Sequence, residues 1–132
     1  MTDSVLVAEH PVGDRVVGQL TLNVEKTLNS LTREMVEIIT DRLEAWADDD
    51  KVVAVFIDGA CEKAFCAGGD VQALRNSCIE TPGGPCDYAE HFFAREYRMN
   101  YLLHTYAKPL SCWGHGVVMG GGLGILAGCR YR

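Results

Sequence analysis

Residues 51–70 read KVVAVFIDGACEKAFCAGGD, and this stretch sets the architecture of the chain. Its first part, VVAVFID, is an apolar run rich in β-branched residues, which is typical of a strand buried on both faces. Its second part, KAFCAGGD, gathers small residues in a loop that follows this strand. In α/β sheets, ligands bind beyond the carboxyl ends of strands, so we expect the AFCAGGD segment at a binding edge.

The residues before this strand predict paired strands and an amphipathic helix. Residues 5–7 and Arg15–Leu22 are apolar or alternating runs separated by a proline and a glycine, which indicates a β-hairpin or two paired strands. From about Thr32 to Asp48, apolar residues recur at steps of three or four, with Thr32 placed to cap the helix. Strand, helix and buried strand together predict an α/β fold.

The residues after Asp70 predict helices separated by turns. A proline and glycine cluster indicates a flexible surface segment, and Lys108-Pro109 ends the longest helical pattern. The expected elements are a short helix over 71–76, a surface excursion over 77–87, a helix from Tyr88 to the Lys108-Pro109 break, a strand over 110–113 and, after a glycine-rich turn at 114–124, a final helix over 125–129.

Length and charge exclude several classes of protein. The chain has 132 residues, 48% of them hydrophobic, which suits one domain with a buried core. Its formal net charge of −6 argues against a nucleic-acid partner, because neutralising phosphates requires clustered Lys and Arg. The sequence contains neither an apolar run of about 18 residues nor a basic leader, so we expect a soluble, cytosolic protein without a membrane partner.

The cysteines and histidines do not predict a metal centre. Six cysteines are scattered without a CxxC pair, so we interpret them as free thiols that serve as small apolar side chains. The four histidines do not stand at paired ligand spacings with them, so no metal is expected.

A second glycine-rich segment, residues 115–124, reads HGVVMGGGLG. Glycine lets a ligand approach the backbone closely, and free N–H groups at a helix start suit a developing oxyanion, each donor contributing about 3 to 4 kcal/mol to the transition state. Two alternatives stay open. The glycines could simply allow a tight connection, or Gly122-Leu-Gly124-Ile-Leu-Ala127 could be a dinucleotide-binding fingerprint.

Three segments in this order, FCAGGDV, EYRMNYLLHTYAKP and HGVVMGGGLG, resemble the enoyl-CoA hydratase/isomerase (crotonase) superfamily, and most closely its 3-hydroxyisobutyryl-CoA hydrolase branch. The similarity runs over residues 16–129. It implies a crotonase-like superhelix of β-β-α units, of which residues 1–132 form the N-terminal, incomplete part of a single domain.

The resemblance implies a site for a CoA thioester. It places the two oxyanion-hole N–H donors at Gly69 and Gly121. It also implies that the loop around Leu28 and Asn29, together with the backbone of residues 64–68, lines the CoA moiety. The substrate-binding candidates are thus Leu28, Asn29, Ala64, Ala67, Gly68 and, more weakly, Asp70, whose position also fits a helix N-cap.

The carboxylates distinguish members of the superfamily. Hydratases carry a catalytic glutamate where this sequence has Gly124, and glycine cannot exchange a proton, so the resemblance favours hydrolysis. In the hydrolase branch Glu96 matches a substrate-binding acid, although a glutamate on a helix is more often solvated. The principal catalytic glutamate of that branch belongs to a segment after Arg132. No cofactor is implied beyond the coenzyme A of the substrate.

Two further alternatives remain from the sequence. The chain could be a hydratase or isomerase of the same superfamily, or a non-catalytic, truncated crotonase-like fragment. Because members of the superfamily run to about twice this length, the size of an ordinary domain, we expect the chain to pair with another copy as a homo-oligomer or to belong to a longer polypeptide.

Overall fold

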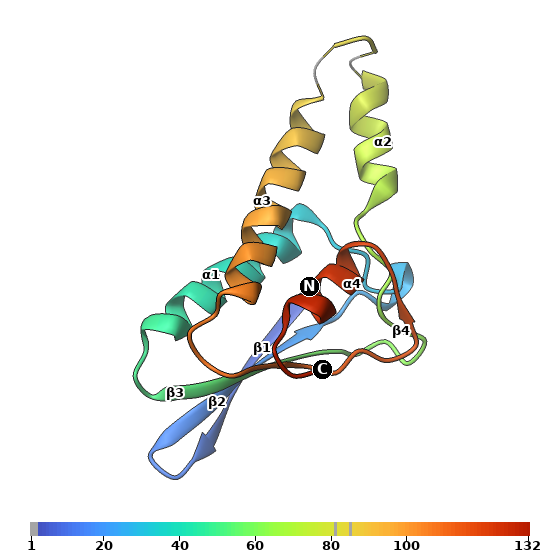
Figure 1. Cartoon of the computed structure of the whole chain (residues 1–132). Helices are drawn as coiled ribbons and strands as arrows, with labels where there is room; N and C mark the ends of the chain where they lie inside the picture. The colour runs from blue at the N-terminus through green and yellow to red at the C-terminus, as the bar shows by residue number, and fades with distance from the viewer. Residues whose placement is uncertain (1–2, 81, 85) are drawn as a thin grey trace.

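The computed structural model describes residues 3–80, 82–84 and 86–132 (Figure 1). Strands and helices alternate along the chain, as the sequence predicts. In chain order they are β1 (Val5–Val12), β2 (Arg15–Leu22), a 3-10 turn (Glu25–Thr27), α1 (Arg33–Asp48), β3 (Val52–Gly59), β4 (Ala64–Cys66), α2 (Val71–Glu80), α3 (Asp87–His104), β5 (Leu110–Cys112), β6 (Val117–Val118) and α4 (Gly121–Gly128).

The strands form two sheets. The larger sheet has the order β1-β2-β3-β5, with β1 antiparallel to β2 and the other pairs parallel. The smaller sheet pairs β4 with β6 in parallel. The chain therefore repeats a β-β-α unit: β1, β2 and α1, then β3, β4 and the α2–α3 hairpin, then β5, β6 and α4. This arrangement confirms the predicted α/β class and its β-β-α units.

Helix α1 packs so closely on strand β2 that the strand has a glycine at the point of contact. The Thr32 side chain accepts a hydrogen bond from the Met35 amide, so the predicted N-cap is confirmed. At the other end of the helix, the Trp46 ring lies directly over β2, where a Cβ on Gly18 would approach it to 2.6 Å. Glycine at this position allows the helix to pack closely on the sheet.

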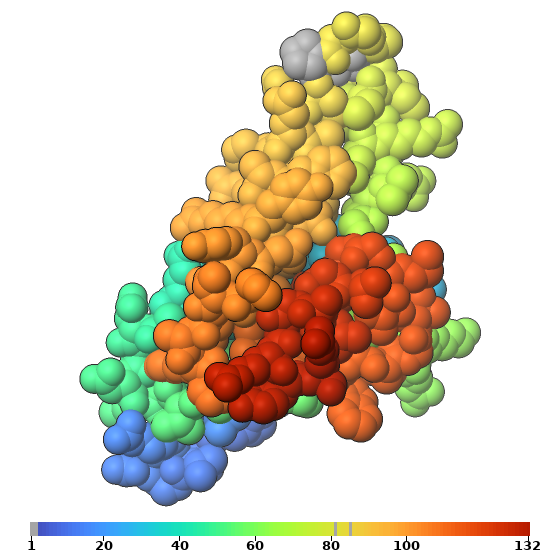
Figure 2. All heavy atoms as spheres, in the orientation of Figure 1, coloured from blue at the N-terminus to red at the C-terminus, as the bar shows by residue number. Residues whose placement is uncertain are grey.

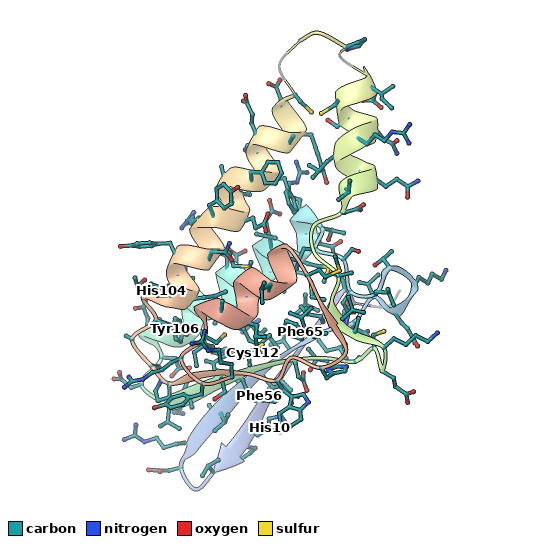
Figure 3. The ribbon with its side chains drawn as sticks, turned by 45° about the vertical axis from the view of Figure 1, so that its right-hand side comes forward. His10, Phe56, Phe65, His104, Tyr106 and Cys112 are labelled. Carbon is teal, nitrogen blue, oxygen red and sulfur yellow. The ribbon has the colours of Figure 1, made fainter. Side chains whose placement is uncertain are left out.

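The hydrophobic core lies between the large sheet and helices α1, α3 and α4. Phe65 of β4 and Cys112 of β5 project into the region between α4 and this sheet (Figure 3), and both are buried. The α2–α3 hairpin instead rises from this body (Figures 1 and 2), and none of the described α2 residues is fully buried. Within the described residues, no helix is long and apolar enough to cross a membrane.

Several predicted boundaries were wrong, among them the end of the first strand, which continues to Val12 instead of ending at residue 7. The final helix begins at Gly121 rather than at residue 125, so the glycines belong to its first turn. The segment 59–70 contains the buried strand β4 as well as a loop. Residues 77–80 extend α2 instead of belonging to a surface excursion, because local helical hydrogen bonding continues to Glu80. Within that predicted excursion, Thr81 and Pro85 lie outside the described residues.

Candidate active site

The two glycine-rich segments meet because the strands before them pair in parallel. Ala64 pairs with Val117 and Cys66 with Val118, and the Met119 amide donates to the Cys66 carbonyl at 3.1 Å. The carboxyl ends of parallel strands lie at the same edge of a sheet. Residues 67–69 and 119–121 therefore leave this edge side by side, as the sequence predicts for a binding edge.

The amide of Gly69 points away from Leu31, the residue that pairs with Gly69 in a parallel β-bridge. The Leu31 amide donates to the Gly68 carbonyl at 2.6 Å, and the Asp70 amide donates to the Leu31 carbonyl at 2.8 Å. Backbone groups of successive residues in an extended segment face opposite edges. With residues 68 and 70 bonded to Leu31, the N–H group of Gly69 faces away from Leu31.

Gly121 is the first residue of α4, so no helical carbonyl four residues back can accept from its amide. This amide nitrogen lies 3.6 Å from the position that a Cβ on Gly68 would take. Gly68 has φ +111°, and the preceding residue of the other segment, Gly120, has φ +50°, so both turns favour glycine. The two segments carrying the predicted donors thus touch at the start of a helix.

Gly122 and Gly124 of α4 use their amides within the helix instead of leaving them free. The Gly122 amide donates to the Met119 carbonyl at 2.8 Å and the Gly124 amide to the Gly120 carbonyl at 3.0 Å. Gly122 also packs so closely on β4 that an added Cβ would lie 2.3 Å from the Cys66 carbonyl oxygen. Both amides are used inside the helix, so this geometry gives no support to the dinucleotide-binding alternative.

The loop at Leu28 and Asn29 is fixed against the AFCAGGD segment. Both residues have positive φ, 54° and 58°. The fully buried Asn29 side chain accepts from the Val24 amide at 2.7 Å and donates to the Phe65 carbonyl at 3.0 Å. The Ala67 amide donates to the Leu28 carbonyl at 3.0 Å. Leu28, Asn29 and Ala67 are therefore held together, while Ala64 is completely buried in β4.

Glu96 of α3 lies beneath the start of α4. Its side chain is almost fully buried, at 6% exposure, so the solvated-face interpretation was wrong. A Cβ on Gly121 would lie 2.5 Å from its Oε1 atom. Burial raises the pKa of the Glu96 carboxyl, and none of the side-chain hydrogen bonds among the described residues reaches it. A largely buried carboxyl group beside the first amide of α4 is a position for a polar ligand group.

The remaining polar groups near the edge have structural explanations. The Asp70 carboxylate accepts from the Ala73 amide at 3.1 Å, which supports its N-cap interpretation at the start of α2. Burial raises the pKa of the Cys66 thiol to about 11, outweighing the Gly68 amide that lowers it. A thiol with this pKa stays protonated near neutral pH, which disfavours Cys66 as a nucleophile. The described residues include no cluster of His, Cys, Asp and Glu that could hold a metal ion.

Two apolar residues of this edge were not predicted from the sequence. Leu31 Cδ1 lies 3.0 Å from the Cβ position of Gly121, and the Phe92 ring lies 3.4 Å from that of Gly69. Phe92 stands one helical turn before Glu96, and both are buried. This i, i+4 spacing places Phe92 and Glu96 on one helix face, and it is the signal in the sequence that could have found Phe92.

Comparison with known proteins agrees with this architecture. The family model described as enoyl-CoA hydratase/isomerase matches residues 17–132. The mitochondrial 3-hydroxyisobutyryl-CoA hydrolase of Danio rerio is 39% identical over 115 residues, which cover 87% of this chain and 29% of that protein. The small ribosomal subunit protein mS47 of Neurospora crassa is 38% identical over 111 residues, which cover 84% of this chain and 22% of that protein.

A solved structure shares both fold and sequence. The carnitinyl-CoA dehydratase from Mycobacterium thermoresistibile superimposes with a TM-score of 0.88 at 43% identity, covering 99% of this chain and 36% of that one. In all three comparisons the chain spans between 22% and 36% of the length of the protein it matches.

Proposed function

The chain belongs to the enoyl-CoA hydratase/isomerase family, and from this membership we propose that it holds the thioester carbonyl of an acyl-CoA in an oxyanion hole made by the Gly69 and Gly121 amides. The observation that carries the proposal is the contact between the two glycine-rich segments, with the Gly121 nitrogen 3.6 Å from the Cβ position of Gly68. Such donors strengthen as the oxygen gains charge, so they favour the transition state over the bound substrate.

The proposed reaction is hydrolysis of a short, branched 3-hydroxyacyl-CoA such as 3-hydroxyisobutyryl-CoA. Gly124 supplies no side chain that could exchange a proton with an alkene, which supports hydrolysis over hydration. The buried, unpartnered Glu96 carboxylate would accept a hydrogen bond from the hydroxyl of the acyl group. The hydrolase of Danio rerio, 39% identical, supports the same substrate class.

In the proposed reaction, a water oxygen adds to the thioester carbon, and the carbonyl oxygen becomes an oxyanion between the two amides. The C–S bond then breaks, CoA leaves as a thiol with the proton released by water, and the hydroxy acid remains. An attacking carboxylate that forms an acyl intermediate before water cleaves it would use the same two amides.

Hydration or dehydration of an acyl-CoA is the second candidate. It is favoured by one observation, the 43% identity to a carnitinyl-CoA dehydratase. A non-catalytic role is the third, since a relative of 38% identity is named as a ribosomal subunit protein.

Turnover separates these candidates. The protein is incubated with 3-hydroxyisobutyryl-CoA and, separately, with crotonyl-CoA, while free thiol and loss of the alkene absorbance are measured. In a polypeptide that also carries the catalytic glutamate of the hydrolase branch, we expect thiol release from the first and no hydration of the second. Fast hydration without thioester cleavage would replace hydrolysis by the second candidate. Binding without either reaction would favour the non-catalytic role.

Gly121→Ala tests the oxyanion hole itself. An added methyl would clash with Glu96 and Leu31, so the first turn of α4 must shift, which would move the Gly121 amide away from the thioester oxygen and lower kcat by about 100-fold or more. Gly124→Ala is the matched control, because its Cβ would meet Asn100 only at an ordinary 3.5 Å. With a 13C-labelled thioester carbonyl, the chemical shift of the bound carbon should move toward its free value in Gly121→Ala. Equal shifts and rates in both variants would contradict the oxyanion hole.

A further inference from the structure

The far end of the α2–α3 hairpin carries a second reactive feature, remote from the glycine edge. Cys78 lies in the last turn of α2, and Cys86 stands at the N-cap position of α3. The Ser77 hydroxyl lies 3.5 Å from the Cys86 sulfur, so the last turn of α2, which also carries Cys78, lies against the start of α3. Cys78 is exposed and Cys86 is half-buried, whereas the other four cysteines are buried.

We propose that Cys78 and Cys86 form a reversible disulfide that cross-links the tips of α2 and α3. The oxidant is a low-molecular-weight disulfide such as oxidised glutathione. One protein thiolate attacks a sulfur of this disulfide, breaking its S–S bond and releasing one thiol. The second protein thiolate then attacks the resulting mixed disulfide at the protein sulfur and releases the other thiol. The protein loses two hydrogens, and the small disulfide gains them as two thiols.

The surroundings shift the pKa values of the two thiols in opposite directions. Hydrogen bonds from the Cys78 thiol and then from the Ser77 hydroxyl and the Ala89 amide lower the pKa of Cys86. The same contact with Cys86 raises the pKa of Cys78. Because the thiolate is the attacking form, Cys86 reacts first and Cys78 resolves the mixed disulfide.

The cross-link has a structural consequence for the hairpin. None of the described α2 residues is fully buried, so α2 is held mainly by its contact with α3. Closing the loop between residues 78 and 86 restricts the open states of this hairpin. Amide hydrogen exchange in α2 should slow on the order of tenfold after oxidation. This inference does not depend on the proposed reaction.

Intact-mass measurement tests the modification. Reduced protein is treated with oxidised glutathione, and its mass and non-reduced peptides are analysed. We expect loss of two hydrogens without retained glutathione and a joined pair of peptides containing Cys78 and Cys86. A cross-link between the buried Cys112 and Cys129, glutathione retained on the unaltered protein, or unchanged α2 exchange would overturn the proposal.

Two cysteine variants test which thiol reacts first with oxidised glutathione. Cys78→Ser should stop at a glutathione adduct on Cys86, whereas Cys86→Ser should leave Cys78 largely unmodified under the same conditions. Ile79→Ala is the matched control, because Ile79 is an exposed residue of the same helix and the change keeps both thiols and the Ser77 hydroxyl, so the cross-link should still form. Equal adduct formation in both cysteine variants would contradict the assigned order, and loss of the cross-link in Ile79→Ala would contradict the direct pairing.

Discussion

At the scale of single residues, the main electrostatic cost to the folded state is the burial of the Glu96 carboxyl group. It is 6% exposed, and burial raises the pKa of its carboxyl above the ordinary value of 4.5. An ionised carboxylate out of water is unfavourable unless a ligand or solvent group satisfies it. A residue retained in such a position fits a polar contact with substrate better than a role in folding stability.

The pH dependence of stability tests this placement. Between the unfolded pKa and the raised folded pKa, the folded state binds more protons than the unfolded state, so the free energy of unfolding falls as pH rises through this window. Glu96→Gln removes this titration. We expect the variant to be more stable than the unaltered protein above the window, with the difference disappearing below about pH 4.

Urea unfolding at a series of pH values measures the effect. Glu90→Gln is the matched control, since Glu90 lies on the same helix and is exposed. An identical pH dependence in the Glu96 and Glu90 variants would show that Glu96 is not buried as described.

At the scale of elements, α4 depends on its close contact with β4. An added Cβ on Gly122 would lie 2.3 Å from the Cys66 carbonyl oxygen, which belongs to a rigid strand. Gly122→Ala must therefore shift the helix, and we expect it to lower the free energy of unfolding by about 1 to 3 kcal/mol. Leu123→Ala, at a neighbouring position with 52% exposure, should change it by about 0.5 kcal/mol or less. Chemical denaturation measures both, and similar losses would contradict the close contact.

The loop before α1 depends on a single buried amide. Asn29→Ala leaves the Val24 amide and the Phe65 carbonyl without their partner and puts alanine at a φ of 58°. We expect a loss of about 2 to 3 kcal/mol in the free energy of unfolding. Ser30→Ala removes only a local hydroxyl bond to the Thr27 carbonyl, so its unfolding midpoint should stay close to that of the unaltered protein. A midpoint for Asn29→Ala equal to that of Ser30→Ala would refute the role of Asn29.

At the scale of the whole molecule, several large apolar side chains are exposed to solvent instead of packing in the core. They gather on α3, on the turn into α4 and on α4 itself, and α3 and α4 lie side by side (Figure 2). On these segments the most exposed are Tyr97, Tyr101, Trp113, Met119 and Leu123. Large exposed apolar side chains gathered on neighbouring elements can mark interaction sites in proteins.

We predict that these side chains are covered by another copy of the chain or by further polypeptide. Sedimentation velocity of the isolated chain should then show species larger than a monomer, and the combined change Tyr97→Ser and Tyr101→Ser should shift them toward the monomer. A stable monomer that unfolds cooperatively would contradict this prediction.

The expected cytosolic location also stays a prediction.

The sequence by itself determined the alternation of strands and helices, the cap at Thr32 and the two glycine-rich segments, because hydrophobic periodicity and glycine placement are local properties. The resemblance to a family supplied the proposed roles of Gly69, Gly121 and Glu96. Only the tertiary structure decided that α4 begins at Gly121 and that Glu96 is buried. Both depend on contacts between β4, α3 and α4, which are far apart in the chain, and no local pattern encodes the distance between them.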